Sequence, residues 1–534
     1  MAEASEKVFY RKATGLTKSI SAHDAFIINL LGLAPTAALS AVLLVVPSLY
    51  PGADVTVAFL LITPIALAYA ANYVALSSVM PRSGGDYVFN GRILHPLFGV
   101  FAGAMFWVTV TVEIGVLSGF AVGWYLAPAL AMSFPGNAAV NAFAEALAGP
   151  WAVVAVGSGI IAFFTLVPIL GTTIWLRVLR IIYYACVLSM IVALGACIPY
   201  SNSSFVAAFN SYASAYSITY EGVLAEASAY GWSSPAFSWA ATGMAVVYMV
   251  MFLTSTWVVF VGGEVREGGK NLPTAIWWST VLAIVVCVLN SLLYFRVVPS
   301  DFTSALVYLS KVGGDAYLLP FEPTLGYLLG ILTGSPLVSF IVGFGVFFWT
   351  LSWLPNMNVM GSRVIFAWAF DGIIPRSLAS VHSRRGTPIP ALILMGLLAE
   401  VALMIAAFTD VVGVLMNISV MILMCYIWTG FAAALLPFRR KDVFELAPSY
   451  VRRKILGVPW VTLTGLVHGF GFVALLILLT LAYPEIGGPV TPLSMGFMAS
   501  VLVGAAVLYF GARWYRLKKE GVDIDWAFKQ IPPA

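Results

Sequence analysis

The sequence predicts an all-α polytopic membrane protein with twelve transmembrane helices, and three observations lead to this prediction. The 534 residues are 61% hydrophobic and have a mean hydropathy of +0.96. Only 9% of the residues are charged, whereas soluble domains average about 25%. Apolar windows of about 20 residues, long enough to cross a hydrocarbon core, recur along the whole chain and leave no room for a sizeable soluble domain.

The apolar windows define the transmembrane segments in order. We expect spans at residues 23–46, 56–79, 97–126, 151–170, 176–198, 236–262, 275–297, 336–358, 389–408, 411–436, 460–482 and 492–512. The first window follows a basic flank, but its apolar run is too long for a cleaved signal peptide and contains Pro35. It is therefore predicted to be a retained helix.

The placement of Lys and Arg residues predicts the orientation of the chain. If the N-terminus is cytoplasmic, Arg296 and Lys311 are the only two of the 27 Lys and Arg residues that fall on the outer side. Basic residues are enriched in cytoplasmic loops, so both termini are expected in the cytoplasm and the number of spans is expected to be even. The basic runs need no nucleic-acid partner, and the lipid bilayer is the partner they imply.

Sequence patterns for catalysis, nucleotide binding and metal binding are missing. The chain has no HExxH or GxSxG motif, and "GEVREGGKN" lacks the register and the Ser or Thr of a phosphate-binding loop. The four cysteines have no metal-ligand spacing and are expected to be small core residues: Cys186, Cys197, Cys287 and Cys425. The sequence therefore predicts neither an enzyme nor a cofactor, and no catalytic residue is assigned.

Span one contains a helix-breaking stretch, "NLLGLAPTAALS". Pro35 has no amide hydrogen and disfavours helix at Ala34, while Gly32 relaxes the backbone before it. We expect the helix to break at residues 32–36; a simple proline kink is the alternative.

Span six contains three consecutive hydroxyl residues in "FLTSTW", 252–257. Neighbouring residues on a helix point about 100° apart, so all three hydroxyls can face one pocket only if the helix is interrupted. The alternative is that they bond back onto their own helix. Interrupted spans at corresponding places in two halves of a chain indicate the central binding site of a transporter.

Three sequence blocks resemble the amino acid, polyamine and organocation transporter family. The block "VVFVGGEVREGGKNLPTAI" at 258–276 resembles the cytoplasmic end of the sixth helix of that family. The block "SRVIFAWAFDGIIPRSLASVHSRRGTPIPA" at 362–391 is similar to the eighth helix and its approach to helix nine. The block "MPRSGGDYVFNGRILHPLFGVFAG" at 80–103 matches the loop between helices two and three. With the twelve-span layout, the resemblance extends over nearly the whole chain.

The resemblance implies a LeuT-like fold, in which two inverted five-helix repeats are followed by two further helices. It divides the chain into a cytoplasmic tail (1–22), the first repeat (23–198), an extracellular loop (199–235), the second repeat (236–436), a cytoplasmic loop (437–459), helices eleven and twelve (460–512) and a cytoplasmic tail (513–534). It also implies an amino acid permease of the cell membrane, a secondary active transporter that works by alternating access. Its substrate partner is an amino acid or a related amine.

The resemblance also implies which residues bind the substrate. In relatives, free amides at the break in helix one hold the substrate carboxylate, and carbonyls at the break in helix six hold its ammonium group. A helix terminus offers about half a unit charge of the appropriate sign. The matching positions are Gly32, Leu33, Ala34 and Thr36 on the carboxylate side and Phe252, Leu253, Thr254 and Ser255 on the amine side. Phe252 matches the aromatic residue that closes over the substrate, whereas Thr254 replaces a glycine, so hydroxyl groups are expected to replace some backbone contacts.

The coupling ion is left open between proton and sodium. Some proton-driven relatives carry a lysine in helix five, and Cys186 stands at that position here. A sodium site requires oxygen ligands from helices one and eight, for which Thr350 and Ser352 are candidates. The alternative is that these hydroxyls bond to their own helix.

Glu113 is an acidic residue near the middle of span three, beside positions that line the pocket in relatives. An ionised acid at the centre of a membrane helix costs about 2.5 to 3.5 kcal/mol, so it normally has a partner or a proton. We expect Glu113 to carry the coupling proton or to pair with a cationic substrate. The alternative is a structural acid that bonds to a neighbouring helix.

Two other functions remain compatible with the sequence. A polyamine or cationic amino acid exchanger is favoured if Glu113 binds the substrate. A channel or a non-transporting sensor on the same scaffold is less favoured. A channel conducts without saturation and shows no counterflow of labelled substrate, which separates it from a transporter.

Overall fold

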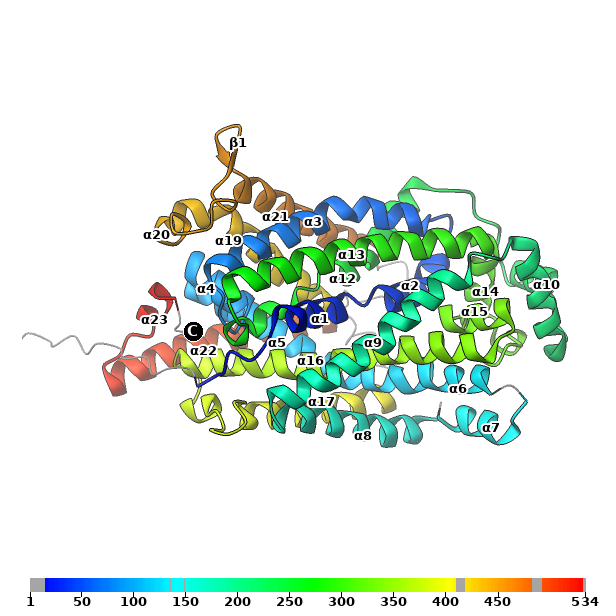
Figure 1. The fold of residues 1–534 in the computed structure, drawn as a ribbon, viewed down its shortest axis with the longest axis horizontal. Coiled ribbons are helices and arrows are strands. Elements are labelled where there is room, and N and C mark those ends of the chain that lie inside the picture. The colour runs from blue at the N-terminus through cyan, green and yellow to red at the C-terminus, as the bar shows by residue number, and fades with distance from the viewer. Residues whose placement is uncertain (1–14, 135, 148, 410–417, 483–491, 532–534) are drawn as a thin grey trace, which may run out of the picture.

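The computed structural model describes residues 15–134, 136–147, 149–409, 418–482 and 492–531, which are almost entirely helical (Figure 1). Within these ranges, eleven helical segments are long and apolar enough to cross a membrane. They are α1 and α2 (Ala22–Leu33, Pro35–Leu49), α3 (Val55–Val79), α5 to α6 (Pro96–Ser133), α8 (Pro150–Ile169), α9 (Thr172–Ala196), α13 (Gly268–Val297), α16 (Pro336–Phe370), α17 (Ile389–Phe408), α19 (Ile418–Arg439), α21 (Trp460–Ala482) and α22 (Pro492–Glu520). The prediction of an all-α polytopic membrane protein is confirmed.

The predicted span at 236–262 is present as an interrupted element. Helix α12 (Trp239–Leu253) has only 15 residues, and a 3₁₀ turn, η3 (Trp257–Phe260), follows after a non-helical gap. The interruption makes α12 too short to be counted among the eleven long apolar segments. The first residues of the predicted tenth span, 411–417, lie outside the described residues.

Helix starts follow from local sequence signals. Ser21 forms a capping box with Asp24 at the start of α1, and Asp54 and Ser335 cap α3 and α16 with their side chains. Proline occupies the first turn of α5, α8 and α16. It has no amide hydrogen, and the amides of the first turn have no acceptor within the helix. After α5 (Pro96–Phe120), the π-helical segment η1 (Ala121–Leu126) continues without a break into α6 (Ala127–Ser133).

Short elements gather at the two ends of the helix bundle (Figure 1). At one end, called here the α4 end, lie α4 (Asp86–Ile93), α20 (Lys441–Phe444), α23 (Asp525–Lys529) and an antiparallel hairpin of β1 (Lys454–Ile455) and β2 (Val458–Pro459). At the opposite α10 end lie α7 (Ala138–Leu147), α10 (Asn202–Ala213), α14 (Ser300–Val312) and α15 (Leu325–Thr333). The other short elements are α11 (Tyr220–Ala229) and the 3₁₀ turns η2 (Ser214–Tyr216), η4 (Gly262–Glu264), η5 (Gly314–Ala316) and η6 (Arg376–Ala379).

The two long segments between predicted spans, 199–235 and 298–335, are folded. Residues 199–235 contain α10 and α11, and residues 298–335 contain α14 and α15. Phe302 of α14 stacks on Tyr220 with ring centroids 4.2 Å apart and meets Phe209 of α10 at 4.9 Å. These aromatic contacts bury apolar surface and stabilise the fold of both segments, although residues 199–235 are rich in Ser.

Helices α1 and α2 lie in the centre of the bundle, and the C-terminal helix α22 lies at its edge. The most apolar window of α1 and α2 is 83% buried, compared with 17% for α22. Helix α1 packs against α13, α9 and α16, which are distant in sequence. The interrupted first span is therefore surrounded by other helices and is positioned to line an internal site.

Candidate functional site

The first predicted break is present between α1 and α2. Helix α1 ends at Leu33 and α2 begins at Pro35, while Ala34 between them adopts a left-handed conformation with φ 42° and ψ 57°. Such a conformation is uncommon for a residue other than glycine and is held here because Pro35 cannot continue the hydrogen-bond ladder of α1. The amides in the first turn of α2 have no acceptors within the helix and point back towards the break.

The second predicted break is present after α12. The helix ends at Leu253, and Thr254 to Thr256 have no regular structure before η3 begins. The hydroxyl of Thr254 donates to the carbonyl of Val250 at 2.6 Å, so it bonds back onto its own helix. The amide of Thr256 donates to the hydroxyl of Tyr69 in α3 at 3.2 Å.

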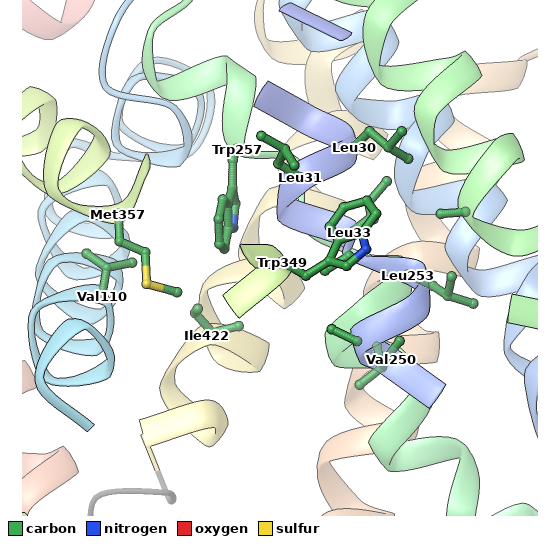
Figure 2. Close-up of a cluster of buried hydrophobic side chains, with 14 of the residues drawn as sticks. Leu30, Leu31, Leu33, Val110, Val250, Leu253, Trp257, Trp349, Met357 and Ile422 are labelled. Atoms are coloured by element: carbon green, nitrogen blue, oxygen red, sulfur yellow. The ribbon is translucent and has the colours of Figure 1, made fainter. Parts of the chain in front are cut away.

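The two breaks contact each other directly. A Cβ atom added to Gly32 would lie 2.9 Å from the indole of Trp257, so the ring packs against the glycine backbone at the first break. Figure 2 shows Trp257 between Leu31 of α1 and Met357 of α16. The amide of Val258 also donates to the Asn29 side-chain oxygen at 3.5 Å. Only glycine leaves room at position 32 for this contact.

A cavity of about 280 Å³ opens beside the two breaks. It begins at Gly32, Trp257 and Met357 and extends along α2, α5, η1 and α12. Its volume is close to the lower bound, about 300 Å³, of sites that enclose a small molecule. The π-helical segment η1 contributes Trp124 and Tyr125 to the wall, and π-helical turns often occur at functional sites.

The cavity wall is apolar and aromatic, with one acidic side chain. Glu113 of α5 lines the cavity among the valine side chains of Val112 and Val116. No hydrogen bond or ion pair joins Glu113 to another residue in the part of the chain that the structure describes. A buried carboxylate without a partner is unfavourable, so this group is free to bind a proton or a cation.

Ion pairs close the bundle at the α4 end. Arg363 of α16 makes two hydrogen bonds of 2.7 and 2.9 Å with Glu264 of η4, and both side chains are fully buried. Arg92 of α4 pairs with Asp371, which follows α16, at 2.5 Å. Arg180 of α9 pairs with Asp24 of α1 at 2.7 Å. These pairs connect elements from distant parts of the sequence on the side of the breaks away from the cavity.

The structure brings four of the eight predicted substrate-site positions to the cavity wall. Gly32, Phe252, Thr254 and Ser255 line it, and the neighbour of Thr36, Ala37, lines it in place of Thr36 itself. Three further positions are buried without lining it in the described part of the chain: Leu33, Ala34 and Leu253. The hydroxyl of Thr36 is buried and has no hydrogen-bond partner among the described residues.

The predicted coupling residues fall in different places. Glu113 and Thr350 line the cavity. The hydroxyl of Thr350 donates to the Val346 carbonyl at 3.2 Å, and that of the fully buried Ser352 donates to the Trp349 carbonyl at 2.6 Å. In the described residues, His, Cys, Asp and Glu side chains form no group of three that could hold a metal ion. Cys186 is buried, with its sulfur 3.9 Å from the carbonyl of Gly345.

Sequence reasoning missed most of the aromatic wall. Trp353 lines the cavity and donates its indole hydrogen to the Leu31 carbonyl of α1 at 2.8 Å. Tyr426 of α19 and Tyr248 of α12 also line it. Apolar spans contain many aromatic residues, and their sequence carries no signal for which of them face an internal cavity. Phe252 was expected at the site through the family resemblance, and Trp257 directly follows the three hydroxyl residues; both line the cavity.

The sequence is similar to those of known proteins. A family model described as amino acid permease matches residues 25–507, nearly the whole chain. The Asc-type amino acid transporter 1 of Mus musculus is 30% identical over 135 residues, which cover 25% of this chain and 22% of that protein. The Homo sapiens protein of the same name is 28% identical over 182 residues, 34% of this chain and 31% of that protein. The matched stretches therefore span less than a third of the length of these relatives.

Proposed function

The chain belongs to the amino acid permease family, whose members are transporters and not enzymes, and on this premise we propose that it is a secondary active transporter of amino acids or related amines. The cavity beside the two helix breaks is the observation that carries the proposal. Interrupted helices that meet at an internal cavity provide unpaired amides and carbonyls where a charged small molecule can bind.

The chemistry of the cavity supports a substrate with a charged group and an apolar body. The first-turn amides of α2 and the positive end of its dipole favour a carboxylate. The last carbonyls of α12 and the carboxyl group of Glu113 favour an ammonium group. Aromatic side chains such as Trp124 and Trp353 offer apolar surface to the rest of the molecule. The name of the Asc-type amino acid transporter 1 relatives is consistent with an amino acid.

Alternating access is the mechanism we propose for this chain. The ion pairs at the α4 end close one side of the site, while the cavity runs from the breaks along α2 and η1. Transport then requires the α4 end to open while the cavity side closes. We propose that α12 completes a set of twelve spans in two inverted five-helix repeats plus two further helices. We also propose that the α4 end faces the cytoplasm of a cell whose plasma membrane holds the protein, as the distribution of basic residues favours.

A transport assay tests the proposal. The purified full-length chain is reconstituted in liposomes and offered radiolabelled amino acids, amines and nucleobases. We expect saturable uptake of an amino acid or amine, and counterflow of label when the liposomes are preloaded with the same unlabelled compound. Conductance without saturation or counterflow would reject the proposal in favour of a channel.

A polyamine or cationic amino acid exchanger is the second candidate function. The single observation that favours it is the unpaired Glu113 in a cavity wall that contains no Lys or Arg among its described residues. If polyamines or cationic amino acids compete best in the same assay, and a preloaded cation accelerates uptake, the exchanger is favoured.

A further inference from the structure

Asp86, the first residue of α4, is a buried acid that pairs with no basic side chain among the described residues. Its Oδ1 accepts hydrogen bonds from the hydroxyl of Tyr73 and, at 2.6 Å, from that of Thr429. Its Oδ2 is buried and has no hydrogen-bond partner in the described part of the chain. The acids of the three ion pairs at the same end each contact an arginine. Asp86 therefore retains one buried carboxylate oxygen that no described residue uses.

Packed tyrosine rings connect Asp86 to the cavity and to the break in span six. Tyr73 and Tyr69 of α3 lie with ring centroids 4.5 Å apart. The ring of Tyr69 also lies 5.1 Å from that of Tyr426, and its hydroxyl accepts the amide hydrogen of Thr256 at 3.2 Å. Tyr426 lines the cavity and Thr256 ends the break. The path from Asp86 to both features consists of direct side-chain contacts.

No Lys or Arg among the described residues forms an ion pair with Asp86. Arg92 on the same helix is paired with Asp371. The other titratable groups near Asp86 are neutral in their ordinary forms: Tyr69 and Tyr73 on α3, Cys425 and Tyr426 on α19, and Tyr87 on α4, with His468 of α21 packed against Tyr73. Residues of α5 and α23 packed on α4 add Gly99 and Phe528, which carry no charge.

Burial raises the pKa of Asp86 to about 6, although hydrogen bonds from Thr429, Tyr73 and its own backbone amide lower it. Burial raises the pKa because it disfavours the ionised form. The carboxyl group is mostly protonated below this pH and mostly ionised above it. The group therefore changes charge within the range that cells experience.

We propose that Asp86 is a proton-binding site, and that its occupancy is transmitted through Tyr73 and Tyr69 to Thr256 and to the cavity wall at Tyr426. A proton from solvent adds to Oδ2, and the carboxylate becomes a neutral acid. The neutral acid is a weaker acceptor for the hydroxyls of Tyr73 and Thr429, so the contacts of Tyr69 with the break are rearranged. Asp86 acts on the substrate through other residues and is a positioning residue. The role of this proton site in transport rests on the proposed function, whereas the binding of the proton does not.

Infrared difference spectroscopy of the purified full-length protein tests the proton site without any substrate. The absorbance of protonated carboxyl groups is recorded while the pH is changed between about 5 and about 8, on either side of the pKa of Asp86. We expect a component that titrates near pH 6 in the wild type and is missing in Asp86→Asn, but is retained in Glu113→Gln. It is also retained in Asp442→Asn, which removes an exposed acid at the same end. A wild-type titration identical to that of Asp86→Asn would overturn the proposal.

The conservative variant Thr429→Val keeps the test valid if Asp86→Asn does not fold. This variant removes one of the two donors to Oδ1, so the ionised form is less stabilised and the titration moves to higher pH. No movement would also overturn the proposal.

Labelling of the cavity tests whether the protonation is transmitted. The four native cysteines are buried, so a thiol reagent reports on a cysteine introduced by Ser255→Cys beside the cavity. We measure how much the labelling rate changes between about pH 5 and about pH 8. We expect this change to be about threefold larger when Asp86 is present than in the Asp86→Asn background, because two conformations exchange population. Equal pH profiles in both backgrounds would overturn the transmission. If the transport assay fails while these responses persist, the proposed function fails and the proton site stands.

Discussion

The arginine-paired acids at the α4 end and the acid in the cavity wall have opposite surroundings. Glu264 accepts two hydrogen bonds from Arg363, whereas Glu113 has no hydrogen-bond or ion-pair partner among the described residues. A buried charge needs a partner to offset its desolvation. The paired acids therefore hold helices together, and the unpaired acid is available for a ligand or a proton. The difference separates the end of the bundle held by ion pairs from the part that contains the cavity.

The largest effect is expected when the paired region is broken. Arg363→Ala leaves Glu264 buried and unpaired, which typically costs about 3 to 5 kcal/mol. We expect a large loss of folded protein and a lower midpoint of thermal unfolding in detergent. Arg513→Ala is the matched control, since Arg513 pairs with Asp523 and Asp525 at the surface and is expected to change stability by about 0 to 1 kcal/mol. Equal stability of the two variants would contradict the structural role of the buried pair.

The next effect concerns the unpaired acid. Glu113→Gln keeps the shape of the side chain but removes its charge and its titration. We expect uptake, or the dependence of uptake on pH, to fall by more than about tenfold, which corresponds to about 1.4 kcal/mol, while folded protein remains in the membrane. The effect of Glu113→Gln is measured as the rate of uptake into liposomes over a series of pH values. Unchanged transport at every pH would make Glu113 a structural acid and remove the contrast with Glu264.

A smaller effect is expected where the two breaks meet. Gly32→Ala would place a methyl group 2.9 Å from the indole of Trp257, and overpacking of this kind costs about 1 to 3 kcal/mol. We expect slower uptake and weaker substrate binding. Gly159→Ala in α8 has nothing within 4 Å of the added methyl group and serves as the control, with transport unchanged. If Gly32→Ala transports as well as the control, the contact between the breaks is not required.

The smallest effect is expected from the hydroxyl that bonds back onto its helix. Thr254→Val removes the hydrogen bond to the Val250 carbonyl, and an average hydrogen bond within a membrane protein contributes about 0.6 kcal/mol. We expect substrate affinity to fall by no more than about threefold. A loss of more than about tenfold, or 1.4 kcal/mol, would instead identify Thr254 as a direct ligand. Ser255→Ala, at the neighbouring cavity position, is measured beside it.

The local features of the fold could be predicted because each depends on neighbouring residues. Apolar length gave the spans, and the order Gly32, Ala34, Pro35 gave the first break, since a missing amide hydrogen acts on the residues beside it. Three hydroxyls in an apolar run indicated the second break. The separate roles of the three hydroxyl residues could not be predicted from the sequence, because the path of an interrupted backbone decides where each hydroxyl points. Thr254 bonds to its own helix and Thr256 turns towards Tyr69.

The sequence by itself determined the class of the protein, the positions of its long apolar helices, the two breaks and Glu113 as an unusual acid. The tertiary structure alone decided which acids are paired and which side chains form the cavity. Arg363 meets Glu264 across 99 positions of the chain, and the indole of Trp353 meets the Leu31 carbonyl across 322. The physical reason is that burial and pairing depend on contacts between helices, which periodicity within one helix does not encode.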